Sequence, residues 1–248
     1  MPALKKYRCD LHIHTCLSPC ADLDMYPRAL VAGSIKAGLD VIGICDHNAA
    51  ENAGYVMSAA DGKGLTVFPG MEITSREEVH ILSLFENVEP LYTLQKIVYE
   101  ALPGVNDENV FGCQAIVNEH DEVEGVSEKL LIGSTTLSLE TIVETVHDLG
   151  GIVIAAHVDR ESFGIIGQLG FIPDTLSLDA LEVSYRTNPA EFMKKFPELS
   201  RYPFITSSDA HRIEDIGRAY TVLEIRQPTI EECLKAFGGS AGRRIVEP

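Results

Sequence analysis

The sequence predicts an α/β fold in which a parallel barrel forms one domain over residues 1–248. Short apolar runs alternate with segments of helical periodicity about seven times, a rhythm typical of β-then-α units. Most of these runs end in His, Asp or Glu, and enzymes built on parallel strands gather functional groups at the carboxyl ends of their strands. No internal repeat or low-complexity linker divides the 248 residues, a length that suits one barrel.

The first half of the chain predicts four strands and three helices. The strands are expected at residues 7–13, 41–45, 65–68 and 79–85. The first helix is expected between Pro27 and Gly38, because proline suits a first helical turn, whose N–H groups lack partners, and glycine suits a helix end. Residues 51–60 and 90–101 predict two further helices, the second with its apolar residues on one face.

The second half begins with a change of pattern. An insertion at about residues 86–136 carries polar turns and two strand-like pieces, at 113–118 and 126–132, which predict an inserted hairpin or flap. Barrel elements then resume with a helix and four strands, at residues 139–149, 152–156, 180–184, 204–207 and 222–225. Thr229 and Glu232 form a capping-box pattern at the start of a last helix, which ends at Gly238.

Composition and charge restrict the partners. The formal net charge is −17, and an acidic surface repels nucleic acid at long range, so no duplex nucleic acid is expected as a partner. Bound divalent cations would cancel that charge locally, so a small phosphorylated substrate is compatible with it. No apolar run approaches the roughly 20 residues that span a bilayer. Six unevenly spaced cysteines and the lack of a secretory pattern predict a cytoplasmic protein with free thiols and no membrane partner.

A divalent-metal site is the first functional hypothesis. His12 and His14 stand two apart on a strand, so both imidazoles project from one face. Other candidate ligands follow later strands, where scattered structural histidines would have no reason to gather. Only His80 stands at the start of its apolar run, and pattern alone would place it on the surface. The nine candidate ligands are His12, His14, Asp22, His47, Glu72, His80, His157, Asp209 and His211.

These motifs together resemble the PHP (polymerase and histidinol phosphatase) superfamily of metal-dependent phosphoesterases. The opening Asp10-Leu11-His12-Ile13-His14-Thr15 is similar to its first motif, and Cys45-Asp46-His47-Asn48 is similar to its second. The later motifs follow in order: Pro69-Gly70-Met71-Glu72, Val79-His80-Ile81-Leu82, Ala156-His157 and Ser208-Asp209-Ala210-His211. The resemblance covers residues 7 to about 225 and implies a distorted (β/α)7 TIM-like barrel.

The resemblance also implies two to three divalent ions, namely Zn, Mn or Fe. One ion would be held by His12, His14, Glu72 and Asp209. Glu72 would bridge to a second ion, completed by His80 and His157. Asp22, His47 and His211 would hold a third, although the loop after the first motif is longer than the family pattern, which leaves Asp24 as an alternative to Asp22. Mixed imidazole and carboxylate ligands suit these metals better than Ca or Mg.

Other residues near these motifs are candidates for supporting roles. Glu72, Asp209 and His211 are the candidate catalytic ligands, and Asp46 is expected to accept a ring N–H from a ligand histidine. Arg160 and Arg186 are placed to bind a substrate anion, or equally to form surface ion pairs. Cys16 and Cys20 lie close to the predicted metals as soft ligands or redox-sensitive thiols, but ordinary reduced packing cysteines are favoured.

The leading hypothesis is a metal-dependent phosphoesterase that hydrolyses a phosphomonoester or a small nucleotide-like phosphodiester. Clustered divalent ions activate water and stabilise the attacking and leaving oxygens, so no serine or cysteine nucleophile is required. One alternative is an amidohydrolase-like metal hydrolase, which a metal-bridging lysine after a middle strand would favour. Another is a non-catalytic, metal-stabilised regulatory or accessory module. The sequence predicts neither the substrate nor the oligomeric state.

Overall fold

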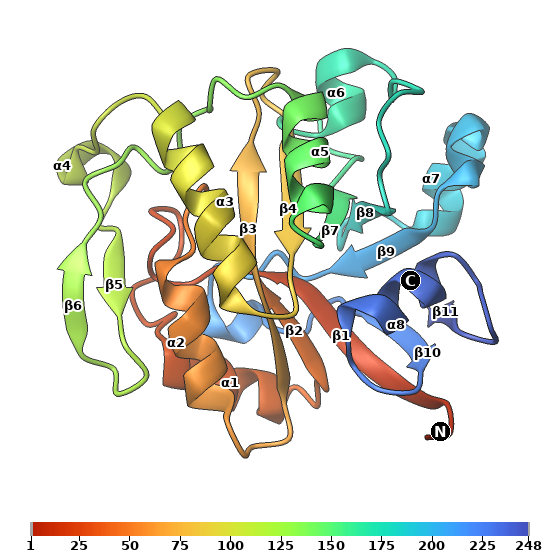
Figure 1. The fold of residues 1–248 in the computed structure, drawn as a ribbon, viewed down its shortest axis with the longest axis horizontal. Helices are drawn as coiled ribbons and strands as arrows, with labels where there is room; N and C mark the ends of the chain where they lie inside the picture. Colours follow the sequence, from red (N-terminus) through yellow and green to blue (C-terminus); the bar gives the residue numbers. More distant parts are fainter. Residues whose placement is uncertain (1, 248) are drawn as a thin grey trace.

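A nine-stranded sheet organises the computed structural model, which describes residues 2–247 (Figure 1). Its strand order is β11-β10-β1-β2-β3-β4-β7-β8-β9. A parallel bridge between Ile13 and Ala210 links the end of β1 to the residues after β9, so the sheet nearly closes into a barrel. The strands are β1 (Lys5–Ile13), β2 (Val41–Ile44), β3 (Thr66–Thr74), β4 (His80–Leu84), β7 (Ile152–Ala155), β8 (Ala180–Ser184), β9 (Phe204–Ser207), β10 (Thr221–Ile225) and β11 (Arg244–Glu247). The predicted TIM-like barrel class is confirmed.

Strand direction departs from the expected parallel barrel. Neighbours β1, β2 and β3 are parallel, as are β7, β8 and β9. Strand β4 is antiparallel to both β3 and β7, because a short turn joins β3 to β4 directly and no helix intervenes. Strand β10 is also antiparallel to β1. The start of β4 therefore lies at the same rim as the carboxyl ends of its neighbours.

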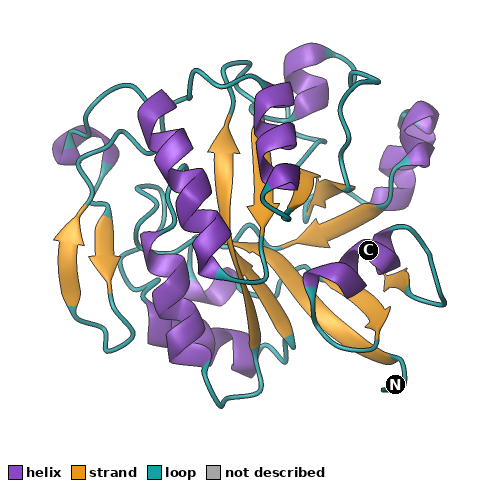
Figure 2. Cartoon of the chain, viewed as in Figure 1, coloured by secondary structure: helices purple, strands orange, loops and turns teal. Residues whose placement is uncertain are grey.

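Helices surround the barrel, and most of them lie on its outer face (Figure 2). The longer ones are α1 (Pro27–Lys36), α2 (Glu51–Ala60), α3 (Val88–Ala101), α5 (Leu139–Asp148) and α8 (Ile230–Phe237). The sequence pattern did not predict the short segments α4 (Glu108–Phe111), α6 (Ile165–Leu169), α7 (Pro189–Lys195), η1 (Pro197–Arg201) and η2 (Ile213–Asp215). Thr229 caps α8 by accepting from the Glu232 N–H, but the Glu232 carboxylate binds Arg243 and the Arg226 N–H, so the capping box is only half formed. No helix in residues 2–247 is long and apolar enough to cross a membrane.

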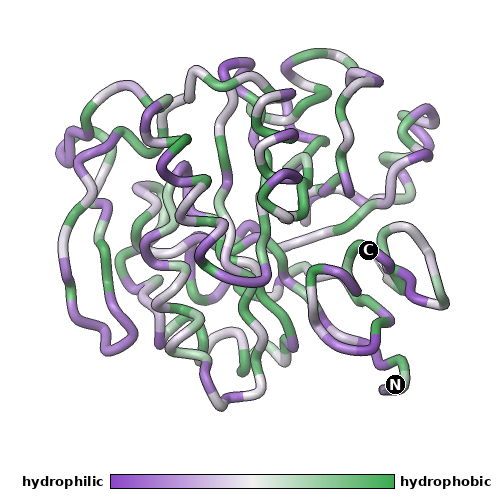
Figure 3. The backbone as a smooth tube through the Cα atoms, in the orientation of Figure 1, coloured by the Kyte–Doolittle hydropathy of each residue, from purple (hydrophilic) through white to green (hydrophobic). Residues whose placement is uncertain are grey.

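Two apolar cores lie on opposite faces of the barrel wall. The interior core contains Leu11, Phe68 and Leu82, and α8 contributes Phe237 to it. The outer core lies between the strands and the helices, and hydrophobic and hydrophilic stretches alternate along the backbone (Figure 3). The interior is narrow: a Cβ on Gly43 would lie 2.4 Å from the Leu11 carbonyl oxygen, so only glycine fits there.

A β-bulge in β1 orients the histidines of the first predicted motif. The register of β1 with β2 shifts between Asp10 and Ile13. Leu11 belongs to the interior core, whereas Ile13, two residues later, belongs to the outer core. Because a bulge changes the alternation of side chains, His12 and His14 also project inward, at the rim. The prediction that these two histidines share a face is confirmed.

The insertion forms a small hairpin beside the barrel. Strands β5 (Ala115–Val117) and β6 (Val123–Val126) make a separate two-stranded sheet next to α2, with a hydrophilic turn at its tip (Figures 1 and 3). Asn52 of α2 holds β5: its amide donates to the Ala115 carbonyl (3.1 Å), and its oxygen accepts from the Val117 N–H (3.0 Å). The hairpin is thus fixed to a barrel helix.

Candidate metal centre

The rim at the carboxyl ends of the parallel strands gathers eight of the nine predicted ligands. His12 lies near the end of β1 and His14 directly follows it. His47 follows β2, and Glu72 lies on β3 where the pairing passes from β2 to β4. His80 opens the antiparallel strand β4 and pairs with Thr74, at the end of β3. Pattern alone placed His80 on the surface, and that placement is wrong. Because β4 is antiparallel to its neighbours, its first residue lies at the rim where their carboxyl ends meet. His157, Asp209 and His211 follow β7 and β9.

His12 and His14 present unprotonated nitrogens to one point. The Nδ1 of His12 lies 3.1 and 3.2 Å from the Glu182 oxygens, so it carries the proton. Ser18 donates to Asp46 (2.6 Å), so the Nδ1 of His14, 3.0 Å from the Ser18 hydroxyl, must be the donor there. The two Nε2 atoms are then lone pairs only 3.1 Å apart, with Asp209 Oδ1 at 3.4 and 3.2 Å. The two nitrogens and this carboxylate oxygen are therefore placed to bind one divalent ion.

Glu72 is the centre of the cluster. Its Oε1 lies 2.7 Å from His80 Nδ1 and 3.2 Å from His157 Nε2, and its Oε2 lies 3.1 Å from His47 Nδ1. Burial alone would raise its pKa, but His80, His12 and His47 hold the pKa well below its usual value. His47 Nδ1 and His80 Nδ1 are buried and have no hydrogen-bond partner among the described residues, despite these short contacts. Buried imidazole nitrogens that have no hydrogen bond and face a carboxylate are suited to bind a metal ion.

Three groups of donors could each hold an ion. In each group one donor atom per residue lies within 4.8 Å of the others. The groups are His12, His14 and Asp209; His47, Glu72 and His80; and His14, His47 and His211. Imidazole and carboxylate oxygen are the ligands that zinc, manganese and iron accept. The residues present therefore fit the divalent centre that the sequence predicts.

Glu182 supports the centre and was missed by the sequence analysis. It is 1% exposed in β8, accepts from His12 Nδ1 and lies 3.2 Å from the His157 N–H. A carboxylate that holds a ligand imidazole fixes its tautomer and orientation. The available signal was a Glu within the otherwise apolar run Ala180–Ser184, since a buried carboxylate needs a partner.

Asp10 and Asp46 lie behind the ligands. Asp10 accepts from the Ser208 and Gly217 N–H groups and so anchors the loop that carries Asp209. Asp46 accepts from the Thr15 N–H, the Thr15 hydroxyl and Ser18, and no ring N–H within residues 2–247 contacts it directly. Its link to a ligand passes through Ser18 to His14 rather than through the adjacent His47. Burial raises the pKa of each carboxyl to about 6.

Backbone strain marks the ligand positions. His157 and Asp209, each just past a strand end, have φ of 29° and 50°, and Asn48 beside His47 has φ of 50°. Residues other than glycine rarely adopt positive φ, and such strain gathers where the surrounding structure enforces a functional geometry. Asn48 is held by hydrogen bonds from its amide to the Leu131 and Gly133 carbonyls.

Asp22 is the predicted ligand that the structure places apart. Its side chain is 51% exposed and lies 3.5 Å from Arg212 Nε. The alternative Asp24 is exposed too. Cys20 is nearer the cluster: its Sγ lies 3.1 Å from His211 Nε2, and it lines the same cavity as His47, Glu72 and His80. Cys16, by contrast, is fully buried in the outer core.

The two candidate anion-binding arginines differ in position. Arg160 Nη2 lies 2.5 Å from Asp209 Oδ2, and Arg160 lines the cavity of the cluster. Arg186 is exposed, donates to the Tyr185 hydroxyl (2.9 Å) and is not among the residues lining that cavity. The structure thus brings Arg160, and not Arg186, to the cluster.

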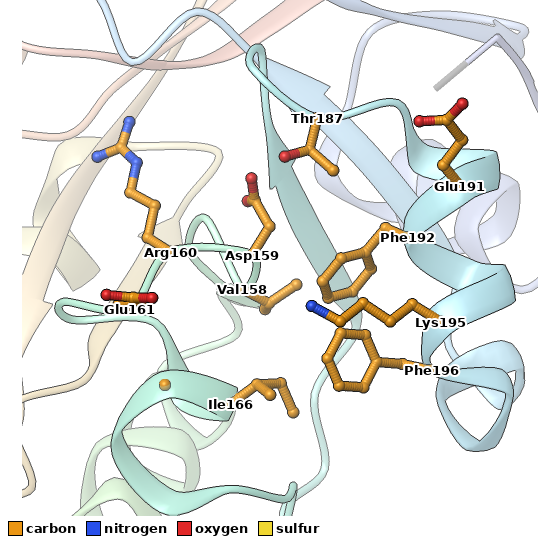
Figure 4. A pocket seen from close by; sticks show the side chains of 11 residues that line it. Val158, Asp159, Arg160, Glu161, Ile166, Thr187, Glu191, Phe192, Lys195 and Phe196 are labelled. Carbon is orange, nitrogen blue, oxygen red and sulfur yellow. The ribbon is translucent and has the colours of Figure 1, made fainter.

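Two cavities adjoin through Arg160. The cavity over the cluster has a volume of about 240 Å³ and is partly covered by Phe163, whose ring stacks on His80 at 4.4 Å, and by Ile132 of the insertion. A second cavity of about 380 Å³ lies between α6 and α7 (Figure 4). Phe192 and Phe196 line it, and Lys195 extends its amine between them.

Comparison with known proteins gives relatives for most of the chain. Residues 10–165 match the family described as PHP domain, and residues 193–239 match the one described as PHP-associated. The uncharacterized protein YqxK of Bacillus subtilis strain 168 is 25% identical over 261 residues, covering 98% of this chain. The chain spans 65% of the length of that relative.

Several solved structures share the fold. The lesion-specific endonuclease PfuEndoQ of Pyrococcus furiosus is 20% identical with a TM-score of 0.74, over 97% of this chain and 58% of that one. Endonuclease Q in complex with a 27-mer duplex carrying an abasic lesion is 19% identical with a TM-score of 0.76, over the same shares. A putative metal-dependent phosphoesterase of Bifidobacterium adolescentis is 19% identical with a TM-score of 0.58, over 82% and 87% of the two chains.

The complex with duplex DNA corrects one expectation. The net charge of −17 predicted that duplex nucleic acid is excluded, and that prediction is wrong, because a protein of this fold holds a duplex at its active site. Net charge describes the field of the whole surface, whereas local cations at a site decide what binds there.

The PHP domain match covers more than half of the 248 residues and contains six of the predicted ligands that lie at one rim, namely His12, His14, His47, Glu72, His80 and His157. The chain therefore belongs to the PHP domain family.

Proposed function

We propose that this chain is a metal-dependent phosphoesterase that hydrolyses a phosphomonoester or a small nucleotide-like phosphodiester. The observation that carries the proposal is Glu72, whose two oxygens face different histidines, His80 and His157 on one side and His47 on the other. A carboxylate so placed is suited to bridge two ions, and family membership supports a metal-dependent hydrolase. Two to three ions of Zn, Mn or Fe suit the donors.

Divalent ions held by these residues would supply positive charge for phosphate oxygens and lower the pKa of a water. The chain itself adds Arg160 beside Asp209. A guanidinium has five N–H donors in a planar fork, so Arg160 can contact Asp209 and a phosphate oxygen together. Phe163 and Ile132 line the same cavity and give it apolar surface beside the charged groups.

The second cavity would hold the organic part of the ester. Its apolar lining includes Val158, Phe192 and Phe196, and Arg160 connects it to the cluster. A volume of about 380 Å³ suits a small ligand such as a sugar or a base. Replacing Phe192 with Ala should therefore raise KM for esters with a bulky organic group more than for small ones.

The proposal is tested by Glu72→Ala and Asp209→Ala. Each variant removes a carboxylate that faces several histidines. The metal content of each protein is measured first, and its activity is then screened on phosphorylated metabolites. Hydrolysis of phosphoesters by both variants should fall to background. Glu119→Ala, on the exposed hairpin turn, is the matched control and should keep full activity. Full activity in Glu72→Ala would refute the assignment. Bound metal without turnover on any phosphoester would favour a metal-stabilised module.

A duplex DNA phosphodiester is a second candidate substrate, favoured by the endonuclease Q complex, whose TM-score is 0.76 over 97% of this chain. The screen should therefore include a duplex with an abasic site, assayed for strand cleavage. Cleavage of the duplex without turnover of small esters would favour this candidate. An amidohydrolase-like hydrolase has less support, because no lysine lines the cluster cavity in the described part of the chain.

A further inference from the structure

We propose that Cys20 binds the third ion as a thiolate, in the place that the sequence analysis gave to Asp22. The inference rests on the proposed divalent centre and concerns one ligand of it. It does not depend on which ester the protein hydrolyses.

The position of Cys20 is the first observation. Its sulfur lies 3.1 Å from His211 Nε2, at the mouth of the cavity that His47 and Glu72 also line. Around a tetrahedral zinc, with Zn–S near 2.3 Å and Zn–N near 2.0–2.1 Å, a sulfur and a nitrogen ligand are about 3.5 Å apart. The Cys20 sulfur and the His211 nitrogen would therefore need to move apart only slightly to bind one ion.

The second observation is a group of neighbouring imidazole nitrogens, beside which one buried nitrogen has no hydrogen-bond partner. His14, His47 and His211 place one nitrogen each within 4.8 Å of one another. His47 is 5% exposed, and its Nδ1 has no hydrogen-bond partner in the described residues. This nitrogen lies 3.1 Å from Glu72 Oε2 in the cavity that Cys20 also lines, and a buried imidazole nitrogen without a hydrogen bond is suited to bind an ion there.

The loop between β1 and α1 explains why the cysteine, and not the aspartate, faces the cavity. The Asp22 N–H donates to the His211 carbonyl (2.9 Å), and the Cys16 N–H donates to the Met25 carbonyl (3.0 Å). These bonds hold the loop against the His211 segment. In this path the Cys20 thiol lies on the side of His211, and the Asp22 carboxylate faces Arg212 at the surface.

The experiment uses the whole chain saturated with Co²⁺, because a cobalt–thiolate bond gives an ultraviolet charge-transfer band that imidazole and carboxylate ligands do not. The wild type should show the band, Cys20→Ser should lose it, and Cys113→Ser, a partly exposed cysteine of the insertion, should keep it. Cys20→Asp should restore the metal content without the band. A wild type at saturation without the band, or a Cys20→Ser variant that keeps it, would overturn the proposal.

A second measurement covers the case in which Cys20→Ser does not fold. In the wild type, alkylation of Cys20, followed by peptide mapping, should be at least tenfold slower with Zn²⁺ than after chelation. Equal rates would exclude ligation. Both readouts are independent of turnover, so failure of the phosphoesterase proposal would appear as an inactive protein that still shows the band.

Discussion

At the residue scale, the groups that orient the candidate ligands decide how those ligands can bind a metal ion. The sequence motifs identify His12 and His14, but the direction of their Nε2 atoms results from Glu182 and from the Ser18–Asp46 pair. These partners come from β8 and from the segment after β2, distant in sequence from the histidines. Asp46 stands beside His47 in the chain, yet it acts on His14 through Ser18, because adjacency in sequence does not fix side-chain direction.

Glu182→Gln is predicted to weaken metal binding roughly 10- to 100-fold, the usual effect of removing a carboxylate that orients a ligand. The amide cannot balance a positive charge and can present an N–H to His12, which disturbs its tautomer. Titration of the metal-free protein with Zn²⁺ measures the effect. Glu231→Gln, at the exposed face of α8, is the matched control. Unchanged affinity in Glu182→Gln would show that His12 is oriented without this carboxylate.

At the element scale, strand direction and loop path set the site. The apolar pattern located β4, but the pattern of a strand is the same in either direction, so it could not show that His80 lies at the rim. His80 lies at the rim because the β3–β4 turn reverses the direction of the chain, and only the tertiary structure shows this turn. The hairpin is similar: its existence was predicted, whereas its attachment to α2 through Asn52 depends on contacts across about 60 residues.

Asn52→Ala should loosen the β5–β6 hairpin. It leaves the Ala115 carbonyl and the Val117 N–H without a buried partner, at a cost of about 1–3 kcal/mol. Amide hydrogen exchange should therefore accelerate over residues 115–126 and stay unchanged in β7 and β8. Asn109→Ala, in the exposed α4, provides the control. Unaltered protection in the hairpin would contradict the role of Asn52.

The Glu232–Arg243 pair between α8 and the segment before β11 predicts a pH dependence. Hydrogen bonding to Arg243 lowers the pKa of Glu232 from 4.5 to about 2. Because the folded pKa is below the unfolded value, the stabilisation is complete above pH 4.5 and is lost as the pH falls toward 2. Glu232→Gln should thus be less stable than the wild type at neutral pH.

The measurement is urea unfolding of both proteins at several pH values. The stability difference should be constant above about pH 5.5 and shrink steadily below pH 4.5. A difference that persists unchanged to pH 3 would mean that the carboxylate charge contributes nothing.

At the scale of the whole molecule, the rim concentrates negative charge inside the protein. Glu72, Asp209 and Glu182 are all buried near one another, in a chain of net charge −17. Cations that bind the folded state and not the unfolded chain stabilise it by mass action. The centre is therefore expected to contribute to stability as well as to activity.

Removal of metal should lower the Tm. At an ion concentration 100 times the Kd, binding contributes about 2.7 kcal/mol, which in a domain of this size corresponds to about 5–10 °C. Thermal unfolding before and after chelation measures the shift, and added Zn²⁺ or Mn²⁺ should reverse it. Glu72→Ala should respond much less to added metal. An unchanged Tm after verified metal removal would contradict this prediction.

The sequence by itself determined the barrel class, the PHP family and eight of the residues that gather at the rim. It could do so because most of these residues follow a local pattern, a short apolar strand and then a polar group. This pattern can be recognised without knowing which other segments the residue contacts. Only the tertiary structure decided the direction of β4, the contact of Glu182 with His12 and the position of the Cys20 thiol beside the His211 ring. These depend on hydrogen bonds between segments far apart in the chain, and local patterns carry no information about which distant segments meet.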